Sequence, residues 1–303
     1  MAIRNENHYR AQTKLLPIRE DINVKDQFGF LPLSLIKPTK QSKEKWNEAY
    51  FDDGDIDIRK LSGIHGNLAK MSEFHAGVAE SIVRYWSLPG AKIVDPFAGR
   101  VTRAVVTNRL GREYHGYEIT PNTYKRALAH FDKLGISPNL YLSDGTKLFN
   151  TPDEFSDLIL TCPPYYNIEK YESVDGQLSD SKTYGEFIEM IDVCAENCYR
   201  VARPGSFCVW VVADFRDGGN LIDFHGDTTQ SFKKAGWLYH DIIIMENISP
   251  FAALTQYQSA CKRYTPKTHE YILVFRKPGE YIVPDYCSEN IIEKETKLKQ
   301  FFE

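Results

Sequence analysis

The segment "TCPPY" combines residue types that could hold a flat ring bearing an amino group. It consists of Thr161, Cys162, Pro163, Pro164 and Tyr165, and it follows the apolar run "SDLIL", which is typical of a buried strand. Two prolines lack backbone donors and fix φ, so we expect the carbonyls of Thr161 and Cys162 to face outward as acceptors for an exocyclic amine. The ring of Tyr165 could stack on a planar base, which is worth about 1–3 kcal/mol in nucleic-acid complexes. The alternative is that the prolines only end the strand and Tyr165 covers the core.

Acidic side chains end or follow three consecutive predicted strands. Asp95 ends "KIVD", Glu118 ends "REYHGYE" and Asp144 follows "NLYLS". Ligands of an open parallel sheet bind beyond the carboxyl ends of its strands, where Glu118 could hold ribose hydroxyls and Asp144 an exocyclic amine. Each has an ordinary alternative, namely a β-α turn, a surface glutamate and a β-turn aspartate. Together they predict a nucleoside site.

The turn "DPFAGRVT" between the first strand and the next helix indicates which nucleoside ligand fits. Gly99 lets the backbone come close to a ligand near a helix N-terminus. The turn contains one glycine and lacks the G-x-G-x-x-G pattern of dinucleotide-binding folds. We therefore expect a nucleoside with a short polar tail rather than a pyrophosphate.

The elements that must position these residues form a repeating pattern. Helical spacing covers 72–86, with Ser72 as its expected cap, and 121–134 and 183–201, while short β-branched runs alternate with the helices. About seven strands result, so the predicted fold is α/β, a doubly wound seven-stranded mostly parallel sheet. We divide the chain into an N-terminal arm (1–60), a catalytic domain (61–280) and a C-terminal tail (281–303), with recognition loops at about 167–182, 214–225 and 247–268.

Composition limits the cellular context and the partners. The 303 residues carry a net charge of −4 with a pI near 6.1, so a nucleic-acid partner requires a local basic patch. Six cysteines show no paired C-x-x-C spacing, which favours reduced thiols and predicts no metal site. No signal-peptide pattern or long apolar run is present. These features predict a soluble cytoplasmic protein without a membrane partner.

With these motifs in place, the chain resembles the amino-methyltransferases of DNA from Phe74 to about Lys277. Those enzymes carry [D/N/S/T]-x-P-P-[Y/F/W] at the target amine and D-P-F-x-G-S-G-T at S-adenosylmethionine, on a Rossmann-like class I methyltransferase fold. The resemblance implies an S-adenosylmethionine site whose residues are His75, Asp95, Pro96, Phe97, Ala98, Gly99, Glu118 and Asp144. It also implies that Thr161, Cys162, Pro163, Pro164 and Tyr165 hold the target base.

Two departures from that pattern affect the interpretation. The chain reads Gly99-Arg100-Val101-Thr102 in place of G-S-G-T, so the cofactor turn must bend without a second glycine. Cys162 stands where serine is usual in the T-S-P-P-Y form linked to N4-cytosine methylation. A C5-cytosine nucleophile is disfavoured, because that family places cysteine after proline and here the order is reversed.

The resemblance implies methyl transfer to cytosine N4 of DNA, in a duplex with a flipped base or in a single strand. Adenine N6, an RNA guanine amine and a degenerate non-catalytic binding subunit are the alternatives. We expect a monomer or homodimer encoded by a prokaryote or phage, with a cognate restriction endonuclease as a candidate partner. Phosphate contacts could come from Lys37, Lys40, Lys43 and Lys45 in the arm and from Lys262, Arg263 and Tyr264 in "CKRYTPK". The alternative for both segments is a solvated charged loop.

Overall fold

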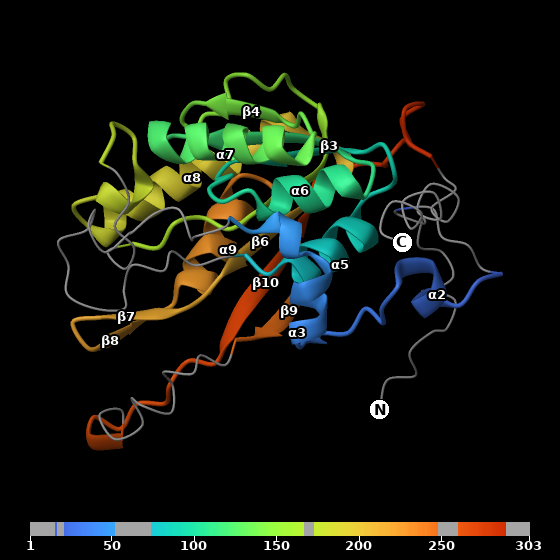
Figure 1. Ribbon diagram of the computed structural model, residues 1–303. Coiled ribbons are helices and arrows are strands. Elements are labelled where there is room, and N and C mark those ends of the chain that lie inside the picture. The colour runs from blue at the N-terminus through green and yellow to red at the C-terminus, as the bar shows by residue number, and fades with distance from the viewer. Residues whose placement is uncertain (1–15, 17–20, 52–73, 167–172, 248–259, 289–303) are drawn as a thin grey trace.

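A computed structural model describes residues 16, 21–51, 74–166, 173–247 and 260–288, and all structural statements refer to these residues. Its centre is an eight-stranded sheet with the order β1-β9-β10-β6-β5-β2-β3-β4 (Figure 1). The pairs β2–β3, β2–β5, β3–β4 and β5–β6 are parallel, whereas β10 is antiparallel to both β6 and β9. This arrangement confirms the predicted mostly parallel doubly wound sheet.

The strands of the sheet occupy the segments that the sequence predicts, with one addition. Seven of them are β2 (Lys92–Asp95), β3 (Glu113–Glu118), β4 (Asn139–Leu142), β5 (Ser156–Thr161), β6 (Ala202–Val212), β9 (Leu238–Glu246) and β10 (His269–Arg276). Chain order reverses between β2 and β5, and connections run to opposite faces from that point. The carboxyl ends of β2 and β5 are therefore the place where this fold leaves room for a ligand.

Helices cover both faces of the sheet. One face packs against α5 (Ala76–Trp86), α6 (Thr102–Arg109) and α7 (Pro121–Leu134), and the other against α8 (Tyr184–Val201) and α9 (Phe224–Lys234). Helix α8 shows why these segments fold as they do. Thr183 caps its first turn, and Phe187, Ile191, Cys194 and Cys198 recur at helical spacing and are fully buried.

The described part of the N-terminal arm, within residues 21–51, packs on the rest of the chain and extends its sheet. It contains α2 (Val24–Phe28), β1 (Leu35–Ile36), α3 (Lys40–Lys45) and the 3-10 helix η1 (Asn47–Ala49). Strand β1 extends the sheet by pairing parallel to β9. Trp46 is buried and its indole donates to Glu80 of α5 at 2.6 Å. A Cβ on Gly77 would lie 2.7 Å from Ser42, so glycine allows α3 to pack against α5.

Three predicted boundaries change. The expected cap Ser72 lies outside the described residues, and α5 is capped instead by His75, whose Nδ1 accepts from the Gly77 amide at 3.2 Å. The predicted loop 214–225 contains the hairpin β7 (Phe215–Asp217) and β8 (Asn220–Ile222) and the start of α9. Within 173–182 the chain forms the 3-10 helix η3 (Leu178–Asp180). Predicted loop residues 167–172 and 248–259 lie outside the described part.

The described part of the C-terminal tail packs at the start of the central strand β5, at the end of the strand remote from the cavity. The hydroxyls of Tyr281 and Tyr286 each donate to the buried carboxylate of Asp157 at 2.9 Å. The tail therefore secures the amino-terminal end of β5. Among the described helices, none combines the length and apolar character needed to cross a membrane.

Candidate functional site

A cavity of about 730 Å³ lies at the carboxyl ends of β2, β3 and β5. It brings together most of the residues that the sequence singles out. The predicted residues on its wall are His75, Pro96, Phe97, Gly99, Glu118, Asp144, Cys162, Pro163, Pro164 and Tyr165. The nucleoside residues and the Pro-Pro-Tyr segment thus share one cavity. Asp95, Ala98 and Thr161 are not on the wall.

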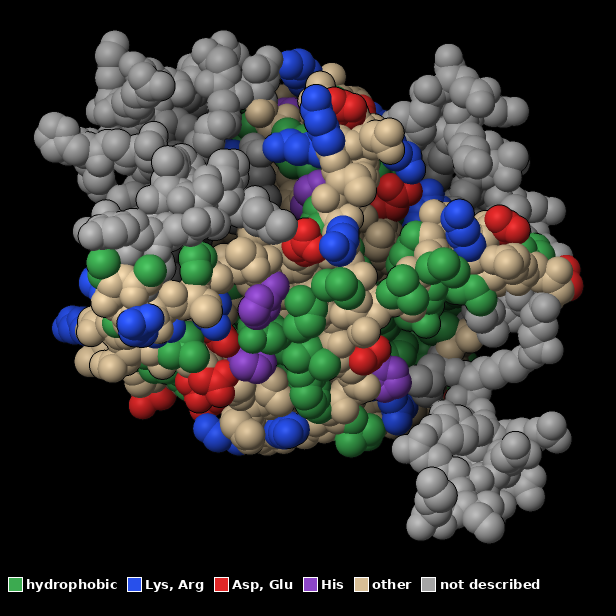
Figure 2. Space-filling view, turned by 90° about the horizontal axis from the view of Figure 1, so that it is seen from below, with side chains coloured by type: hydrophobic (Ala, Val, Ile, Leu, Met, Phe, Trp, Pro, Cys, Tyr) green, Lys and Arg blue, Asp and Glu red, His purple; other side chains and the backbone are tan. Residues whose placement is uncertain are grey.

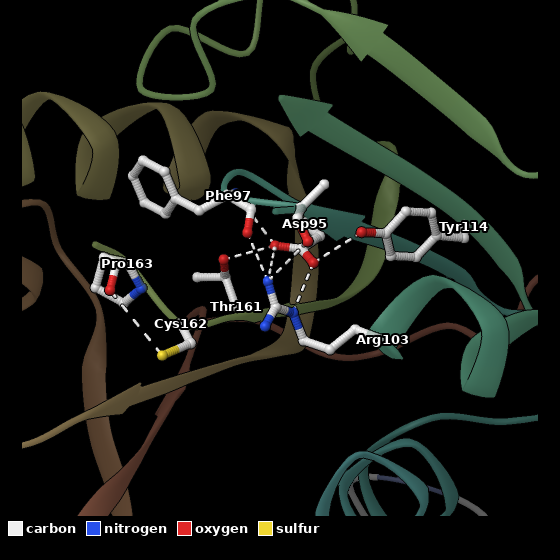
Figure 3. A network of polar contacts seen from close by, with 8 residues as sticks. Asp95, Phe97, Arg103, Tyr114, Thr161, Cys162 and Pro163 are labelled. Carbon is white, nitrogen blue, oxygen red and sulfur yellow. Dashed lines mark hydrogen bonds and ion pairs between the residues drawn. The ribbon is translucent and has the colours of Figure 1, made fainter. Parts of the chain in front are cut away.

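Asp95 instead anchors a buried group of polar side chains that we call the Asp95 cluster: Asp95, Arg103, Tyr114 and Thr161. Arg103 Nε donates to Asp95 Oδ2 at 2.7 Å, Tyr114 donates to Oδ2 at 2.8 Å, and Thr161 donates to Oδ1 at 2.6 Å (Figure 3). Asp95 and Thr161 are fully buried. The Asp95 carboxylate, which we expected to face the cofactor, is therefore used inside the protein, and so is the Thr161 hydroxyl. The expectation for Thr161 concerned its backbone carbonyl and stays a prediction.

The physical reason is the position of the two residues at the ends of neighbouring strands. Thr161 ends β5 and Asp95 ends β2, which pairs with β5, and there the Thr161 hydroxyl reaches the Asp95 carboxylate inside the protein. Burial lowers the pKa of Arg103, but the carboxylate of Asp95 more than offsets this and the pKa is raised. Burial and then Asp95 raise the pKa of Tyr114, which keeps its hydroxyl protonated as a donor. The cluster joins the ends of β2 and β5 and thereby fixes the two turns that follow them.

The turn after β2 bends without the second glycine. Gly99 has a φ of +50°, where glycine is favoured, whereas Val101 has a φ of −60° and a buried side chain. Arg103 Nη2 donates to the carbonyl of Phe97 at 2.5 Å, and the Ala98 amide donates to the carbonyl of Tyr117 at 2.8 Å. Valine in place of the second glycine therefore causes no backbone strain at position 101.

Glu118 and Asp144 carry the acidic charge at the β3 and β4 end of the cavity. Glu118 accepts from the amide and hydroxyl of Thr120, and burial raises the pKa of its carboxyl. Asp144 Oδ1 accepts from the Thr146 amide at 2.9 Å, which is the β-turn arrangement considered as its alternative, while Oδ2 lies 2.9 Å from Lys147 Nζ. Both residues still reach the cavity wall. The β4–β5 loop lies close to the turn after β2 at Gly145, where a Cβ would lie only 1.7 Å from the Pro96 carbonyl oxygen.

The segment after β5 presents its prolines and Tyr165 to the cavity. Tyr165 packs edge-on against Phe224, with ring centroids 6.1 Å apart. Further aromatic rings support it from behind and form one continuous group: Tyr166, Tyr184, Phe187 and Phe215. Cys162 is a partly exposed cysteine that forms no disulfide, and its sulfur lies 4.0 Å from the Pro163 carbonyl oxygen. The turn thus packs against this aromatic group beside the cavity.

Sequence reasoning missed several residues of the cavity wall. Some belong to the arm: Pro38, Thr39, Lys40 and Lys43, of which only the lysines were considered, as phosphate contacts. Others lie at the ends of the last two strands: Met245, Glu246, Asn247 and Glu270. Polar residues at the end of one long apolar strand ("IIIMEN") and at the start of the next ("HEYILVF") are a signal that could have identified the second group. The sequence of the arm has no such signal, because only tertiary packing brings the arm to the cavity.

The predicted nucleic-acid residues Lys262, Arg263 and Tyr264 do not line the cavity. Tyr264 contacts the β7–β8 hairpin: its hydroxyl donates to the Gly219 carbonyl at 2.9 Å, and Arg216 lies over its ring at 3.8 Å. Lysines of the arm form ion pairs, Lys37 with Glu246, Lys40 with Glu44 and Lys45 with Glu80. On the face in Figure 2, basic and acidic side chains are interspersed over the described part of the surface.

One group of described residues has metal-ligating side chains close together, although the sequence predicts no metal. Asp214, Asp223 and His225 bring their ligand atoms within 4.8 Å of one another. His225 Nδ1 lies 2.8 Å from an oxygen of each aspartate, and its ring stacks on Tyr271 with centroids 4.0 Å apart. These contacts give the group an ordinary structural role at the start of α9.

Comparison with known proteins gives a consistent result. The family model described as DNA methylase, of the N6/N4 type, matches residues 9–129 and 156–302. The Type II beta methyltransferase M.BslI of Bacillus sp. (strain NEB-606) is 27% identical over 136 residues, 40% of this chain and 14% of that protein. The Type II methyltransferase M.BglII of Bacillus subtilis is 28% identical over 135 residues, 44% of this chain and 33% of that protein. The chain thus spans a third or less of these relatives.

Among solved structures, a TehB-like SAM-dependent methyltransferase from Corynebacterium glutamicum aligns with 15% identity and a TM-score of 0.42. The alignment covers 72% of this chain and 93% of that one. The fold assignment rests on the strand order of the sheet itself.

Proposed function

Because the chain belongs to the DNA methylase family of the N6/N4 type, we propose that it transfers a methyl group to the exocyclic N4 amine of cytosine in DNA. S-adenosylmethionine is the methyl donor, and when bound it supplies an electrophilic methyl group on a sulfonium. The observation that carries the proposal is the shared cavity. Residues suited to a nucleoside and the Pro-Pro-Tyr segment lie on the wall of one space of about 730 Å³.

The side chains at one end of the cavity fit the nucleoside part of S-adenosylmethionine. Glu118 and Asp144 offer carboxylate acceptors for hydroxyl and amine donors. Phe97 adds an apolar ring to the same wall, and it packs edge-on against the buried Trp210 with centroids 5.8 Å apart. Asp95 acts one step away, by holding the turn that carries Phe97 and Gly99. It is a positioning residue in this proposal.

The other end of the cavity suits the target base. Tyr165 can stack on an unpaired ring, and the carbonyls of Thr161 and Cys162 are the proposed acceptors for the amine. An aromatic amine is a poor nucleophile because its lone pair is delocalised, so alignment with the methyl group supplies most of the catalysis. A base within a duplex cannot reach this wall, so the target is flipped out or already single-stranded.

Cytosine N4 is proposed over adenine N6 because the segment begins with threonine, while adenine enzymes of the resembled family more often begin with Asp or Asn. The test is incubation with labelled S-adenosylmethionine and unmethylated DNA, followed by digestion and mass spectrometry of the nucleosides. We expect N4-methylcytosine. N6-methyladenine would contradict the choice of base, and methylated guanine in a parallel RNA sample would favour the RNA alternative.

Absence of any methylated nucleoside would contradict the catalytic proposal and favour a binding subunit. A variant pair strengthens the experiment: Tyr165→Phe keeps the ring and should retain methylation, whereas Tyr165→Ala removes the stacking surface. We expect Tyr165→Ala to weaken target binding by about 1–3 kcal/mol while cofactor binding is unchanged. The monomer or homodimer state and a cognate restriction endonuclease stay predictions from the resemblance.

A further inference from the structure

The cavity has a basic region on the side where the arm packs, opposite in charge to the Glu118 and Asp144 end. Lys43 of α3 and Arg100 of the turn after β2 both line the cavity wall. Arg100 stands where the resembled family has serine, so this charge is particular to the present turn. A cavity with acidic residues at one end and cations elsewhere on its wall fits a ligand that carries an anionic group away from its nucleoside.

The arm places both cations through two consecutive aromatic residues. Lys43 Nζ lies 4.7 Å from the ring centroid of Tyr50, and the Arg100 guanidinium lies 5.7 Å from that of Phe51. The hydroxyl of Tyr50 accepts from the amide of Ala76 at 2.9 Å, at the start of α5. The two cations therefore contact a segment of the arm that is itself packed against the start of α5.

Further contacts show that this part of the arm has a defined position on the core. The Thr102 hydroxyl donates to the Ala49 carbonyl at 2.9 Å, and Arg109 forms a two-pronged ion pair with Glu48 at 2.9 and 3.1 Å. Both partners belong to α6, the helix that begins directly after Arg100 and Val101. The turn after β2 and the arm consequently form one unit.

Like Lys43 and Arg100, further charged groups of the cavity wall have contacts within the protein. Arg103 is paired with Asp95, Lys40 with Glu44 and Glu246 with Lys37. Glu270 accepts from the amide of Asn247, and Asp144 is paired with Lys147. Burial, and to a smaller extent the charge of Lys43, lowers the pKa of His75, which agrees with a position of Lys43 beside His75.

We propose that Lys43 and Arg100 bind the carboxylate of the amino-acid part of S-adenosylmethionine. This inference rests on the proposed function. With the nucleoside held at Glu118 and Asp144, the amino-acid part extends along the turn after β2 toward the arm. Cationic donors form strong hydrogen bonds with a carboxylate, and Arg100 offers a planar fork that fits one. The arm is then part of the cofactor site rather than a phosphate-binding appendage.

The test compares two ligands that differ in the amino-acid part. S-adenosylhomocysteine carries the carboxylate, and 5′-methylthioadenosine has the same nucleoside thioether without it. Both are titrated by calorimetry into the full chain and into Lys43→Met, Arg100→Gln and Lys45→Met. Lys43 is exposed, so its substitution leaves folding intact. Lys45 lies on the same helix, outside the cavity wall and paired with Glu80, and serves as the matched control.

We expect Lys43→Met and Arg100→Gln each to weaken S-adenosylhomocysteine about tenfold and to leave 5′-methylthioadenosine within about twofold. Lys45→Met should preserve the preference for S-adenosylhomocysteine. An unchanged preference in both cavity variants would overturn the proposal, as would an equal loss of both ligands. If the unmodified chain bound neither ligand, the cofactor site itself would be wrong, which separates that failure from the failure of this inference.

Discussion

Two arginines of this molecule occupy opposite environments. Arg103 belongs to the Asp95 cluster at the sheet centre, with a buried ion pair of 2.7 Å. Arg216 lies in the β7–β8 hairpin, where its guanidinium covers the Tyr264 ring at 3.8 Å and donates to the Gly219 carbonyl at 3.3 Å. The first contact cannot be exchanged for water without a large cost, whereas the second can. The sheet centre thus holds its arginine by a buried ion pair, whereas the hairpin holds its arginine by contacts exposed to solvent.

Loss of the buried arginine is the strongest way to test this contrast. Arg103→Leu leaves the carboxylate of Asp95 buried without its cation, so we expect the free energy of unfolding to fall by about 3–5 kcal/mol. Urea denaturation monitored by circular dichroism measures it. Arg216→Leu is the matched control and should change the free energy of unfolding by less than about 1 kcal/mol.

A double variant tests whether the loss in Arg103→Leu comes from the unpaired charge of Asp95. Because an apolar pair can replace a buried ion pair, Asp95→Leu combined with Arg103→Leu should recover part of the stability lost in Arg103→Leu alone. Equal losses in Arg103→Leu and Arg216→Leu would contradict the contrast between the two regions.

Thr161 tests whether the cluster positions the target segment or contacts the base directly. Thr161→Val removes the donor to Asp95 Oδ1, and we expect a loss of about 1.5–3 kcal/mol in the free energy of unfolding. Thr161→Ser keeps the hydroxyl and should remain close to the parent chain. A valine variant with unchanged stability and a raised KM for DNA would show that the side chain serves the substrate instead.

His75 gives a smaller effect that depends on pH. Burial lowers the pKa of His75 from its usual value of 6.5, so the folded state favours the neutral ring that caps α5. Its contribution to stability is therefore present above about pH 6.5 and is lost as the pH falls through the lowered pKa. His75→Asn keeps a capping acceptor and should flatten this acid-side loss in unfolding experiments from pH 7.5 to 5. An unchanged pH profile would assign the loss to other groups.

Substitutions at the exposed residues Lys262 and Arg263 should have the smallest effect on stability and a clear effect on DNA binding. Lys262→Gln combined with Arg263→Gln leaves the free energy of unfolding within about 0.5 kcal/mol, because both side chains are exposed. If both contact phosphates, the slope of log affinity against log salt becomes less negative by about 1.8. Fluorescence anisotropy over a salt series measures the slope. An unchanged slope would remove these residues from the DNA-binding surface.

Local patterns in the chain were enough to predict the sheet, the helix bounds 121–134 and part of the cavity wall. Such features depend on residues close in sequence: a turn follows an apolar strand, and parallel strands bring their ends to one edge. The positions of Glu118, Asp144 and the Pro-Pro-Tyr segment follow from that rule. The same reasoning assigned the Asp95 side chain to the cofactor, because its position at a strand end is visible and the direction of its side chain is not.

Tertiary packing decided what each of those residues contacts. Arg103 and Thr161 are separated from Asp95 by 8 and 66 positions, and only the folded sheet brings their donors to one carboxylate. Likewise, no pattern near Lys43 or Tyr50 indicates that α3 reaches the cavity, since Gly77 and Trp46 create that approach through close packing. Burial and packing determine which side chains distant in sequence contact one another, and burial and packing are defined only in the folded chain.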